Sequence, residues 1–488
     1  MSVLYIKLSN STFIRKKSGY IYLFNQINKN ERYYNIESTE FINTLTKKAR
    51  IFDEIIDELH GIFDEDFLII KKDYLEFIKD LEADGFVVTG KSVKELIKKE
   101  PVFSYKNLNQ RVNKEDAVVK IVKESNNDNL ITKNIEVKDE LYIENLYLEV
   151  TRCCNENCIH CYIPEEQKIT NFFISINNAK KYLDQAKELG VWQITITGGE
   201  PFLHPQINEI LKYARKKDFI ITVLSNLTVL NKTHINTLKE IYPSHIQVSL
   251  YSLNSSLHDT ITGLKGSLKK TFETINLCIV NDIPIQINCP IIELNQNDFA
   301  SVLDWAKEKR IKANTDFNIL AQTDFSQDNM INTLSEEGVK KVYSNFLAKD
   351  KESFKEIQQV IFNEKELKIP MNKHVCGAAY NTLFISSKGK VFPCAAWQSL
   401  ELGDLGKDTL KNIYFKSRAS KKVRNIKFKD YCDVIKSELV PFIKVCPAHN
   451  ANSFNGDYKK IPDDVFKNAE LKYESALSVI NKINKKNG

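Results

Sequence analysis

Residues 147–162 read Tyr-Leu-Glu-Val-Thr-Arg-Cys-Cys-Asn-Glu-Asn-Cys-Ile-His-Cys-Tyr, an apolar stretch that leads directly into a group of cysteines. The apolar part predicts a strand, and the loop after it carries Cys154, Cys158 and Cys161. Three thiolates within about eight residues can each bind a different iron of one four-iron four-sulfur cluster. The spacing lacks a fourth protein ligand, so one iron is expected to stay open to a substrate or cofactor.

Other uses of these cysteines fit the spacing less well. A structural zinc ion takes four ligands, usually in Cys-x2-Cys pairs, and no further Cys or His follows at that spacing. A disulfide cluster would require an oxidising compartment, which nothing in the sequence indicates. Cys153 stands one residue outside the pattern and is expected to be a packed thiol on the other face of the strand end.

The cysteine loop resembles the signature of the radical S-adenosylmethionine (radical SAM) superfamily. After the next predicted strand, Gly198-Gly-Glu-Pro201 resembles the superfamily turn whose backbone and Glu hold the amino group of the cofactor's methionine part. Its glycines would let the backbone approach a ligand closely. The resemblance implies that an electron from the cluster cleaves SAM to methionine and a 5′-deoxyadenosyl radical, which takes a hydrogen from an unactivated carbon.

Seven residues are implied by this resemblance to bind the cofactor. Tyr162 would lie near the adenine, and the polar groups at the ends of the third and fourth strands would reach the ribose or carboxylate. The alternatives are packing at the barrel rim for Tyr162 and capping or turn roles for the polar residues. The set is Tyr162, Gly198, Gly199, Glu200, Ser225, Asn226 and Ser249.

Length and composition describe an ordinary soluble chain. Its 488 residues suffice for about three domains, with 42% hydrophobic and 27% charged residues. No run approaches the roughly eighteen apolar residues of a membrane helix, and the N-terminus does not resemble a signal peptide. Ten cysteines without a secretory signal indicate metal sites or catalysis, so we expect a cytoplasmic protein. The formal charge of +6 identifies no partner.

From Leu146 onward, predicted strands and amphipathic helices alternate, which implies parallel strands with right-handed crossovers. The predicted fold class is α/β, a partial (β/α)6 barrel of the kind that the radical SAM resemblance also implies. Chemistry is then expected at the carboxyl ends of the strands. The predicted strands are 146–151, 192–197, 219–225, 245–250, 285–291 and 315–320. The predicted helices are 174–189, 206–216, 233–241, 267–281 and 297–309.

The first ninety residues have a different pattern. Alternating residues in 3–35 predict a small antiparallel sheet, and three helical segments follow, through Phe41, through Phe52 to Phe63 and through Tyr74 to Leu81. Gly85 and a strand at 86–88 complete what reads as a winged helix-turn-helix domain.

This domain is not expected to bind nucleic acid. Residues 51–66 hold seven acidic side chains and no Lys or Arg, so a phosphate backbone would be repelled. In size and element order the segment resembles the PqqD-like peptide-recognition domains of peptide-modifying enzymes. That family implies that a leader peptide adds to the sheet edge near Tyr20–Phe24, beside Tyr74–Leu81. The alternative is that these aromatic residues only fill the domain's own core.

The last quarter of the chain offers a second cysteine group. Cys376, the ending Gly389-x4-Cys394 with its implied hairpin, and Cys446-Pro-Ala resemble the SPASM extension of radical SAM enzymes. The chain departs from the usual seven cysteines, so the resemblance implies one auxiliary iron–sulfur cluster, as in the shortened twitch version. Its ligands would be Cys376, Cys394, Cys432 and Cys446, with Cys432 the doubtful one. Cys278 and Cys289 are expected to be core residues.

These expectations divide the chain into six segments. They are a PqqD-like winged-helix domain in 1–90, a linker in 91–143 with one helix near 93–99, a radical SAM partial barrel in 144–325, a helical connector in 326–370, a SPASM or twitch domain in 371–462 and a C-terminal helix in 463–488.

The order of these domains resembles that of maturases of ribosomally made peptides, especially those that form sulfur-to-carbon thioether links (sactipeptide and ranthipeptide maturases). The implied partners are a precursor peptide with a leader and a flavodoxin- or ferredoxin-like electron donor, with no membrane partner. Three alternatives remain open: a radical epimerase or carbon–carbon crosslinking maturase, an enzyme of tetrapyrrole or quinone-cofactor pathways, and a non-catalytic iron–sulfur regulator.

Overall fold

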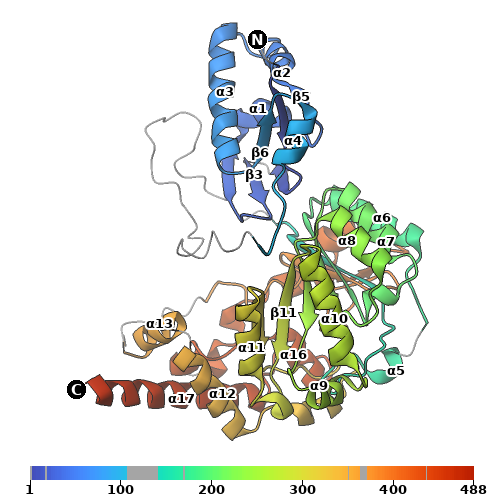
Figure 1. The fold of residues 1–488 in the computed structure, drawn as a ribbon. Coiled ribbons are helices and arrows are strands. Elements are labelled where there is room, and N and C mark those ends of the chain that lie inside the picture. Colours follow the sequence, from blue (N-terminus) through green and yellow to red (C-terminus); the bar gives the residue numbers. More distant parts are fainter. Residues whose placement is uncertain are drawn as a thin grey trace. The chain divides into compact units, whose positions relative to one another are not determined.

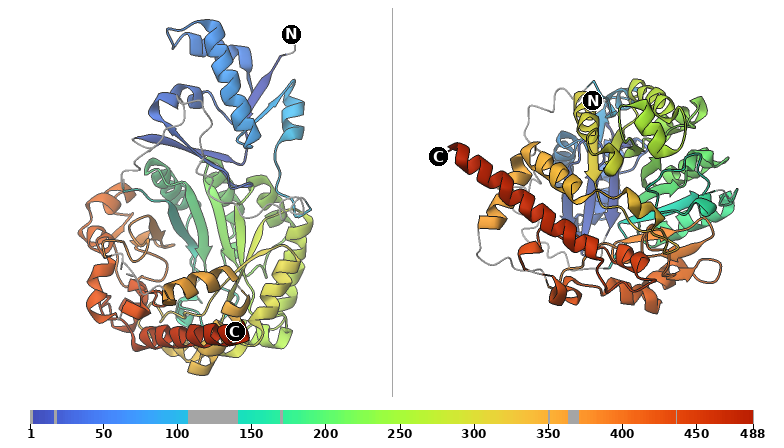
Figure 2. Two further views of the ribbon diagram at one scale, coloured as in Figure 1. Left: turned by 90° about the vertical axis from the view of Figure 1, so that its left-hand side faces the viewer. Right: turned by 90° about the horizontal axis from the view of Figure 1, so that it is seen from below.

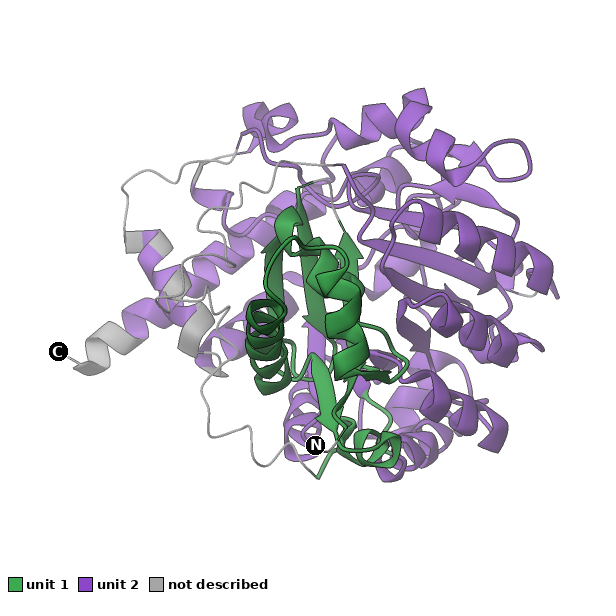
Figure 3. Cartoon of the chain, turned by 90° about the horizontal axis from the view of Figure 1, so that it is seen from above, with its two compact units in different colours: residues 1–140, 282–284 green, residues 141–281, 285–488 purple. Residues whose placement is uncertain are grey.

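The structure is a computed structural model that describes residues 3–16, 19–106, 141–168, 171–349, 351–362, 371–435 and 437–487 (Figure 1). The chain divides into two compact units, which are coloured separately in Figure 3. The first unit comprises residues 1–140 with 282–284, and the second comprises 141–281 with 285–488. Each unit is described by itself.

The first unit contains two small antiparallel sheets instead of the single one expected from residues 3–35. Strands β2 (Thr12–Lys16), β3 (Tyr20–Asn25) and β4 (Glu31–Asn35) form one sheet with β3 in the centre. Strand β1 (Tyr5–Leu8) instead pairs with β5 (Arg50–Ile51) and β6 (Val87–Gly90). The sequence pattern gave the strands, but pairing between residues far apart decides which sheet each one joins.

The three predicted helices and the returning strand lie where the sequence placed them. The helices are α1 (Thr39–Asn43), α2 (Phe52–His60) and α3 (Phe67–Ala83). Asp66 caps α3, since its side chain accepts a hydrogen bond from Leu68 N at 2.8 Å. Tyr74 and Leu81 of α3 are fully buried in the core that the helices share with β1, β3 and β4. The alternative that these side chains fill the domain's own core is therefore correct for them.

The linker contains the expected helix, α4 (Val93–Lys99), which Ser92 caps by accepting from Glu95 N at 3.2 Å. Most of the predicted linker, residues 107–140, lies outside the described residues.

The second unit has six parallel strands in sequence order, joined by helices. This confirms the α/β pattern predicted from the sequence. The strands are β7 (Asn145–Thr151), β8 (Gln193–Gly198), β9 (Ile220–Ser225), β10 (His245–Ser249), β11 (Ile285–Pro290) and β12 (Lys312–Asp316). The connecting helices are α6 (Ile176–Glu188), α7 (Ile207–Lys216), α8 (Lys232–Ile241), α9 (Ser255–Thr262), α10 (Ser267–Val280) and α11 (Phe299–Glu308).

Burial explains why these segments form strands. Ile194 and Ile196 of β8 and Val223 of β9 are fully buried, as expected of parallel strands covered on both faces. The last strand was predicted at 315–320 but ends at Asp316, because Ile319 leaves the sheet and packs instead on Tyr251 and Ile292.

A hairpin from the last quarter of the chain extends this sheet, which the sequence did not indicate. Strand β13 (Thr382–Ile385) pairs in parallel with β7, and β14 (Lys390–Phe392) and β15 (Gly403–Asp404) follow as antiparallel neighbours. The hairpin predicted around Gly389 is present, and Gly389 turns the chain with a φ of +78°. Strand β7 therefore lies between β8 and the cysteine-rich C-terminal segment.

Helices cover the remainder of this unit. Helix α12 (Glu336–Lys349) packs against α17 (Asp463–Asn487), which Figure 2 shows in dark red. Lys340 and Glu474 form an ion pair of 2.8 Å between them. The other helices are α5 (Glu165–Lys168), α13 (Lys351–Phe362), α14 (Leu410–Lys416), α15 (Arg418–Arg424) and α16 (Pro447–Ser453). Within the described part of the chain, we find no helix with the length and hydropathy needed to span a membrane.

Candidate functional site

The three cysteines that follow β7 come together at the carboxyl end of the parallel sheet. Burial raises the pKa of the Cys154 thiol to about 12 and that of Cys158 well above its ordinary value, and the charge of Cys161 adds to both shifts. Buried thiols that repel one another as thiolates require a positive partner, and iron ions supply that charge. The three side chains thus fit the cluster that the sequence predicted.

The glycine turn holds this loop in place. Gly199 N donates to Thr151 O at 2.9 Å, and Glu200 N donates to Cys153 O at 2.8 Å. A Cβ atom on Gly199 would stand 2.3 Å from Cys153 O, and one on Gly198 would stand 2.1 Å from Thr151 O. The sequence suggested that these glycines let the backbone approach a ligand. In the structure, the space that a side chain would need is filled by the backbone oxygens of Thr151 and Cys153.

Glu200 is fully buried at the end of β8 and has three protein donors. Its carboxylate accepts from Ser225 Oγ at 2.9 Å, from Asn226 N at 2.8 Å and from Phe202 N at 2.9 Å. Burial raises its pKa to about 7 despite these hydrogen bonds. The predicted site residues Glu200, Ser225 and Asn226 therefore form one network across two neighbouring strand ends.

Asn226 also connects this network to the cysteine loop. Its Nδ2 donates to Asn155 Oδ1 at 3.1 Å, and Asn155 lies next to Cys154. Ser249 ends β10, two strands away from β8 in the sheet. The predicted polar residues thus occupy consecutive strand ends, as expected for a site at the carboxyl edge of a parallel sheet.

Tyr162 follows Cys161 directly, and charges from both cysteine groups act on its phenol. Burial raises the pKa of its phenol above its usual range, and the charges of Cys161, Glu149 and Cys394 add to the shift. Its carbonyl accepts from Thr323 N at 3.0 Å. The sequence linked Tyr162 only to the first group, whereas the charge of Cys394 in the second group also acts on its phenol.

Three of the four C-terminal cysteines form the second group. Burial raises the pKa of Cys394 to about 12, and the charges of Cys446 and Cys376 add to the shift, whereas Cys376 itself is exposed. Cys432 is outside this trio: its thiol donates to Lys429 O at 3.0 Å, and the charges that act on it are those of Asp433 and Asp430.

No three Cys, His, Asp or Glu side chains within the described ranges converge closely enough to ligate one metal ion together. Around a cuboidal cluster each thiolate binds a different iron, so such thiols stand farther apart than the ligands of a single ion. The lack of a single-ion site therefore does not argue against a cluster at either trio.

A buried charged network, which sequence reasoning missed, joins the two groups. Glu149 of β7 accepts from Ser387 N at 3.0 Å and from Ser387 Oγ at 2.8 Å. Arg152 pairs with Glu149 at 3.2 Å and also donates to Gln167 and Gln398. A charged residue inside an otherwise apolar strand was the available signal, because such a group is buried only when it is paired.

Asn452 of α16 is a second connection. Its Nδ2 donates to Ala321 O and Ala396 O, both at 3.0 Å, and its side chain is fully buried. Ala396 follows Cys394 by two residues, and Gln322, next to Ala321, donates to Cys161 O at 3.4 Å. Short polar contacts therefore lead from one cysteine group to the other.

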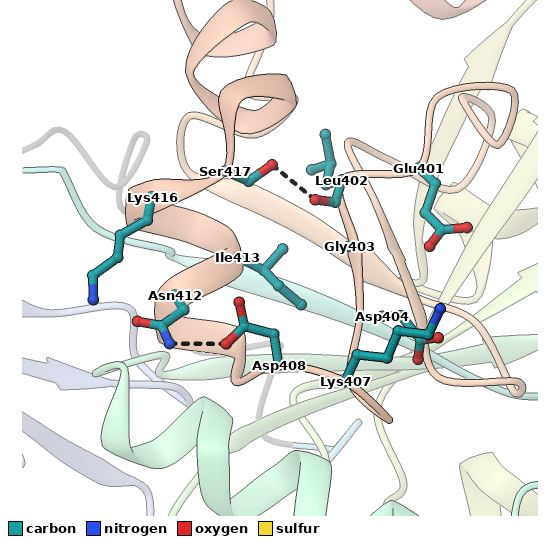
Figure 4. A pocket seen from close by; sticks show the side chains of 10 residues that line it. All are labelled: Glu401, Leu402, Gly403, Asp404, Lys407, Asp408, Asn412, Ile413, Lys416 and Ser417. Atoms are coloured by element: carbon teal, nitrogen blue, oxygen red, sulfur yellow. Dashed lines mark hydrogen bonds between the residues drawn. The ribbon is translucent and has the colours of Figure 1, made fainter.

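Other predictions concern residues away from these groups. Cys278 and Cys289 are fully buried, as predicted for core residues. Figure 4 shows an open pocket of about 430 Å³ on the C-terminal segment, lined by residues such as Asp404, Lys407 and Asn412. None of the residues predicted to ligate iron or bind the cofactor lines this pocket.

Comparison with known proteins finds family matches for two parts of the second unit. Residues 148–306 match the radical SAM superfamily, and residues 376–436 match an iron–sulfur cluster-binding domain named SPASM. The predicted cofactors, which are a four-iron four-sulfur cluster, SAM and an auxiliary iron–sulfur cluster, are those of these domain types.

Two curated proteins show the range of relatives. The antilisterial bacteriocin subtilosin biosynthesis protein AlbA of Bacillus subtilis is 31% identical over 275 residues, which cover 54% of this chain and 58% of AlbA. The chain thus spans less than two thirds of that relative. An AdoMet-dependent heme synthase of Methanosarcina barkeri is 23% identical over 64% of this chain and 92% of its own.

Solved structures share the fold. Streptococcus suis SuiB, bound to its precursor peptide SuiA, matches 94% of this chain and 99% of its own with a TM-score of 0.58 and 14% identity. The protein anSMEcpe with bound AdoMet matches 70% of this chain and 99% of its own with a TM-score of 0.52 and 17% identity. These structures show the fold alone. The family matches identify residues 148–306 as a radical SAM domain and residues 376–436 as a SPASM iron–sulfur domain.

Proposed function

We propose that the chain modifies a ribosomally made precursor peptide and that the product is a thioether between a Cys sulfur and a carbon. The observation that carries this proposal is the short chain of hydrogen bonds between the two cysteine groups, in which Asn452 Nδ2 donates to Ala321 O and to Ala396 O, two residues after Cys394. Two linked cysteine sites suit a reaction with two partners, a carbon and a sulfur. AlbA, a bacteriocin biosynthesis protein, supports a peptide as the substrate.

The first cysteine group would hold the cluster that cleaves SAM. Cys154, Cys158 and Cys161 would each bind an iron, and the turn from Gly198 to Glu200 would fix the loop that carries them. A cluster with SAM bound supplies the 5′-deoxyadenosyl radical, which takes a hydrogen from the substrate carbon. The role of the surrounding side chains is to exclude water and to hold the target carbon in place.

The cofactor would contact the network of Glu200, Ser225 and Asn226, with Tyr162 and Ser249 beside it. Because the protein's own donors already occupy the Glu200 carboxylate, we propose that this carboxylate orients the strand ends and presents its remaining lone pairs to the methionine amino group.

The second group would hold one auxiliary cluster through Cys376, Cys394 and Cys446. Because the Cys432 thiol donates a hydrogen bond to Lys429 O and is outside the trio, one iron of the cluster would lack a cysteine ligand from this chain. A thiolate from the substrate, which loses its proton on binding, is the ligand that we propose for it. Its sulfur would bond to the carbon radical, and the auxiliary cluster would accept the one electron that this step releases.

The leader peptide would bind to the first unit, but not at the strand expected from the sequence. Strand β3 (Tyr20–Asn25) has β2 on one side and β4 on the other, so it cannot accept a further strand. On the β2 side, Lys47 Nζ donates to Thr12 O at 2.5 Å and thereby covers part of that edge. We therefore propose the outer edge of β4, where Tyr33 is 43% exposed.

The tetrapyrrole pathway is the second candidate, because the heme synthase of Methanosarcina barkeri is matched over 92% of its length. Epimerisation or carbon–carbon crosslinking of a peptide would use the same residues. None of the ten cysteines, which all lie in the described ranges, forms a disulfide, and this is compatible with the reducing cytoplasm that we propose as the compartment. A flavodoxin- or ferredoxin-like protein is the proposed electron donor.

Removal of residues 1–90 tests the assignment of a peptide substrate. The truncated chain should still cleave SAM but should not modify a peptide that carries its leader, since the leader site is lost. Tyr33→Arg in the full chain is a milder version and should weaken leader binding while SAM cleavage continues. Equal turnover of leader-bearing and leaderless peptides by the intact chain would contradict recognition of a leader.

A further inference from the structure

We propose that Tyr251 is a positioning residue that donates a hydrogen bond to the Cys158 sulfur and makes the SAM-cleaving cluster easier to reduce. The inference rests on the proposed function only in taking Cys158 as an iron ligand. It concerns the cluster's reduction potential and holds for any substrate.

The contact is formed at the end of the fourth parallel strand. Tyr251 follows β10 by two residues, is 3% exposed, and places its hydroxyl 3.9 Å from Cys158 Sγ. The same hydroxyl lies 3.4 Å from His160 Nε2, and the two rings meet edge to face at 5.0 Å. One phenol thus touches the side chains of two residues of the cysteine loop.

The direction of the phenol proton follows from His160. A neutral imidazole ring carries a proton on only one of its two nitrogens. Among the described residues, Nδ1 is buried and has no hydrogen-bond partner. A buried N–H without a partner is rarer than a buried acceptor without one, so the proton belongs on Nε2. Nε2–H then donates to the Tyr251 oxygen, and the phenol proton is directed to sulfur.

The ring is held so that this direction persists. Asn295 Nδ2 donates to Tyr251 O at 2.9 Å, and Tyr251 N donates to His258 Nδ1 at 3.4 Å. Ile261 and Ile292 pack around the side chain. A tyrosine phenol ordinarily has a pKa of about 10, so the hydroxyl carries its proton at neutral pH and can donate it.

A donor at this sulfur affects the two redox states unequally. Reduction adds one electron to the cluster and its sulfur ligands, and an O–H donor stabilises the more negative state more strongly. The hydrogen bond therefore raises the reduction potential. Glu156, whose Oε2 lies 3.7 Å from Cys158 Sγ, is a separate contact that the test leaves unchanged.

The test is Tyr251→Phe, which removes the hydroxyl and keeps the ring. The loaded enzyme is titrated with a reductant at one fixed pH, and the EPR signal that changes on addition of SAM identifies the relevant cluster. We expect the equilibrium constant for reduction of the cluster to fall on the order of tenfold, which corresponds to a reduction potential lower by about 59 mV for one electron. Tyr213→Phe is the matched control. The Tyr213 hydroxyl on α7 donates a hydrogen bond to Asp184 on α6, and removal of this hydroxyl should leave the reduction potential unchanged.

An unchanged potential in Tyr251→Phe, with iron content equal to that of the wild type, would overturn the proposal. If that variant does not retain its cluster, His160→Phe decides, since it removes the donor to the phenol oxygen and leaves the phenol itself. His160→Phe should lower the reduction potential by less than the shift expected for Tyr251→Phe. An unchanged potential in His160→Phe would overturn the proposal. Failure of the cluster assignment would differ, because no SAM-responsive signal would then exist in the wild type.

Discussion

The Glu149 carboxylate on strand β7 accepts two hydrogen bonds from Ser387, a residue 238 positions later in the chain. Ser387 lies in the turn between β13 and β14, which continue the parallel sheet beside β7. Glu149 is 2% exposed, and Arg152 of the cysteine loop pairs with it. The strand that leads to the first cysteine group is thereby joined to the SPASM segment by a buried, charge-assisted contact.

Ser387→Ala should destabilise the chain by about 1 to 2 kcal/mol, because it removes the Oγ donor and leaves a buried carboxylate with one partner fewer. Denaturant unfolding measures this loss. Ser256→Ala is the control, since Ser256 is exposed on α9 and its replacement should change stability by less than about 0.5 kcal/mol. Equal stability of the two variants would show that the contact contributes nothing.

Gly199→Ala should displace the cysteine loop, because its Cβ would stand 2.3 Å from Cys153 O and 2.4 Å from Arg152 O. We expect loss of iron from the first site and a fall in SAM cleavage on the order of a hundredfold. Gly19→Ala, with no atom within 4 Å of its Cβ, is the control and should cleave SAM normally. Normal SAM cleavage by Gly199→Ala would mean that the turn does not position the loop.

Iron counting separates the two cysteine groups. Replacement of Cys154, Cys158 and Cys161 by Ala should leave about four irons per chain, held by the second group. Adding Cys376→Ala, Cys394→Ala and Cys446→Ala should remove the remainder.

Cys432→Ala serves as the matched control within the same domain. Because the Cys432 thiol donates a hydrogen bond to Lys429 O and is outside the trio, we expect Cys432→Ala to keep its full iron content and an unaltered EPR signal. Loss of the auxiliary signal in Cys432→Ala would restore this residue as the fourth ligand.

The buried carboxyl of Glu200 should make the stability of the cluster-free chain depend on pH. Its folded-state pKa of about 7 lies above the ordinary value of 4.5, so the folded chain binds more protons than the unfolded chain between these values. The free energy of unfolding should therefore fall as pH rises through that window. Glu200→Gln cannot lose a proton there, and its slope between about pH 5 and pH 7 should be shallower.

Glu188→Gln controls for the loss of one carboxyl group, since Glu188 is exposed at the end of α6. Its slope should stay close to that of the wild type. If Glu200→Gln retains the wild-type slope as well, the carboxyl is not the source of the pH dependence.

Local patterns in the sequence predicted most of the second unit. The predicted helix 267–281 corresponds to α10 (Ser267–Val280), and the predicted strand 219–225 corresponds to β9 (Ile220–Ser225). Burial on both faces of each strand produces apolar runs that are visible without a structure. Cys154, Cys158 and Cys161 likewise lie within one short loop, so their spacing is also visible without a structure.

What the sequence did not indicate depends on contacts between distant segments. Pairing of β13 with β7, the central place of β3 in its sheet and the bond between Glu149 and Ser387 join residues that no local period connects. The same limit applies to Gly199, because the carbonyl oxygens of Arg152 and Cys153 leave no room there for the Cβ atom of another residue.

The measurement that tests the proposed function most directly is anaerobic co-expression of the chain with the short, Cys-containing peptide encoded nearest to its gene, followed by tandem mass spectrometry. We predict the loss of two hydrogens for each link, together with a Cys that can no longer be alkylated. An unchanged mass with one deuterium gained from heavy water would show epimerisation instead. A peptide recovered without any modification would contradict a peptide substrate and favour the tetrapyrrole alternative.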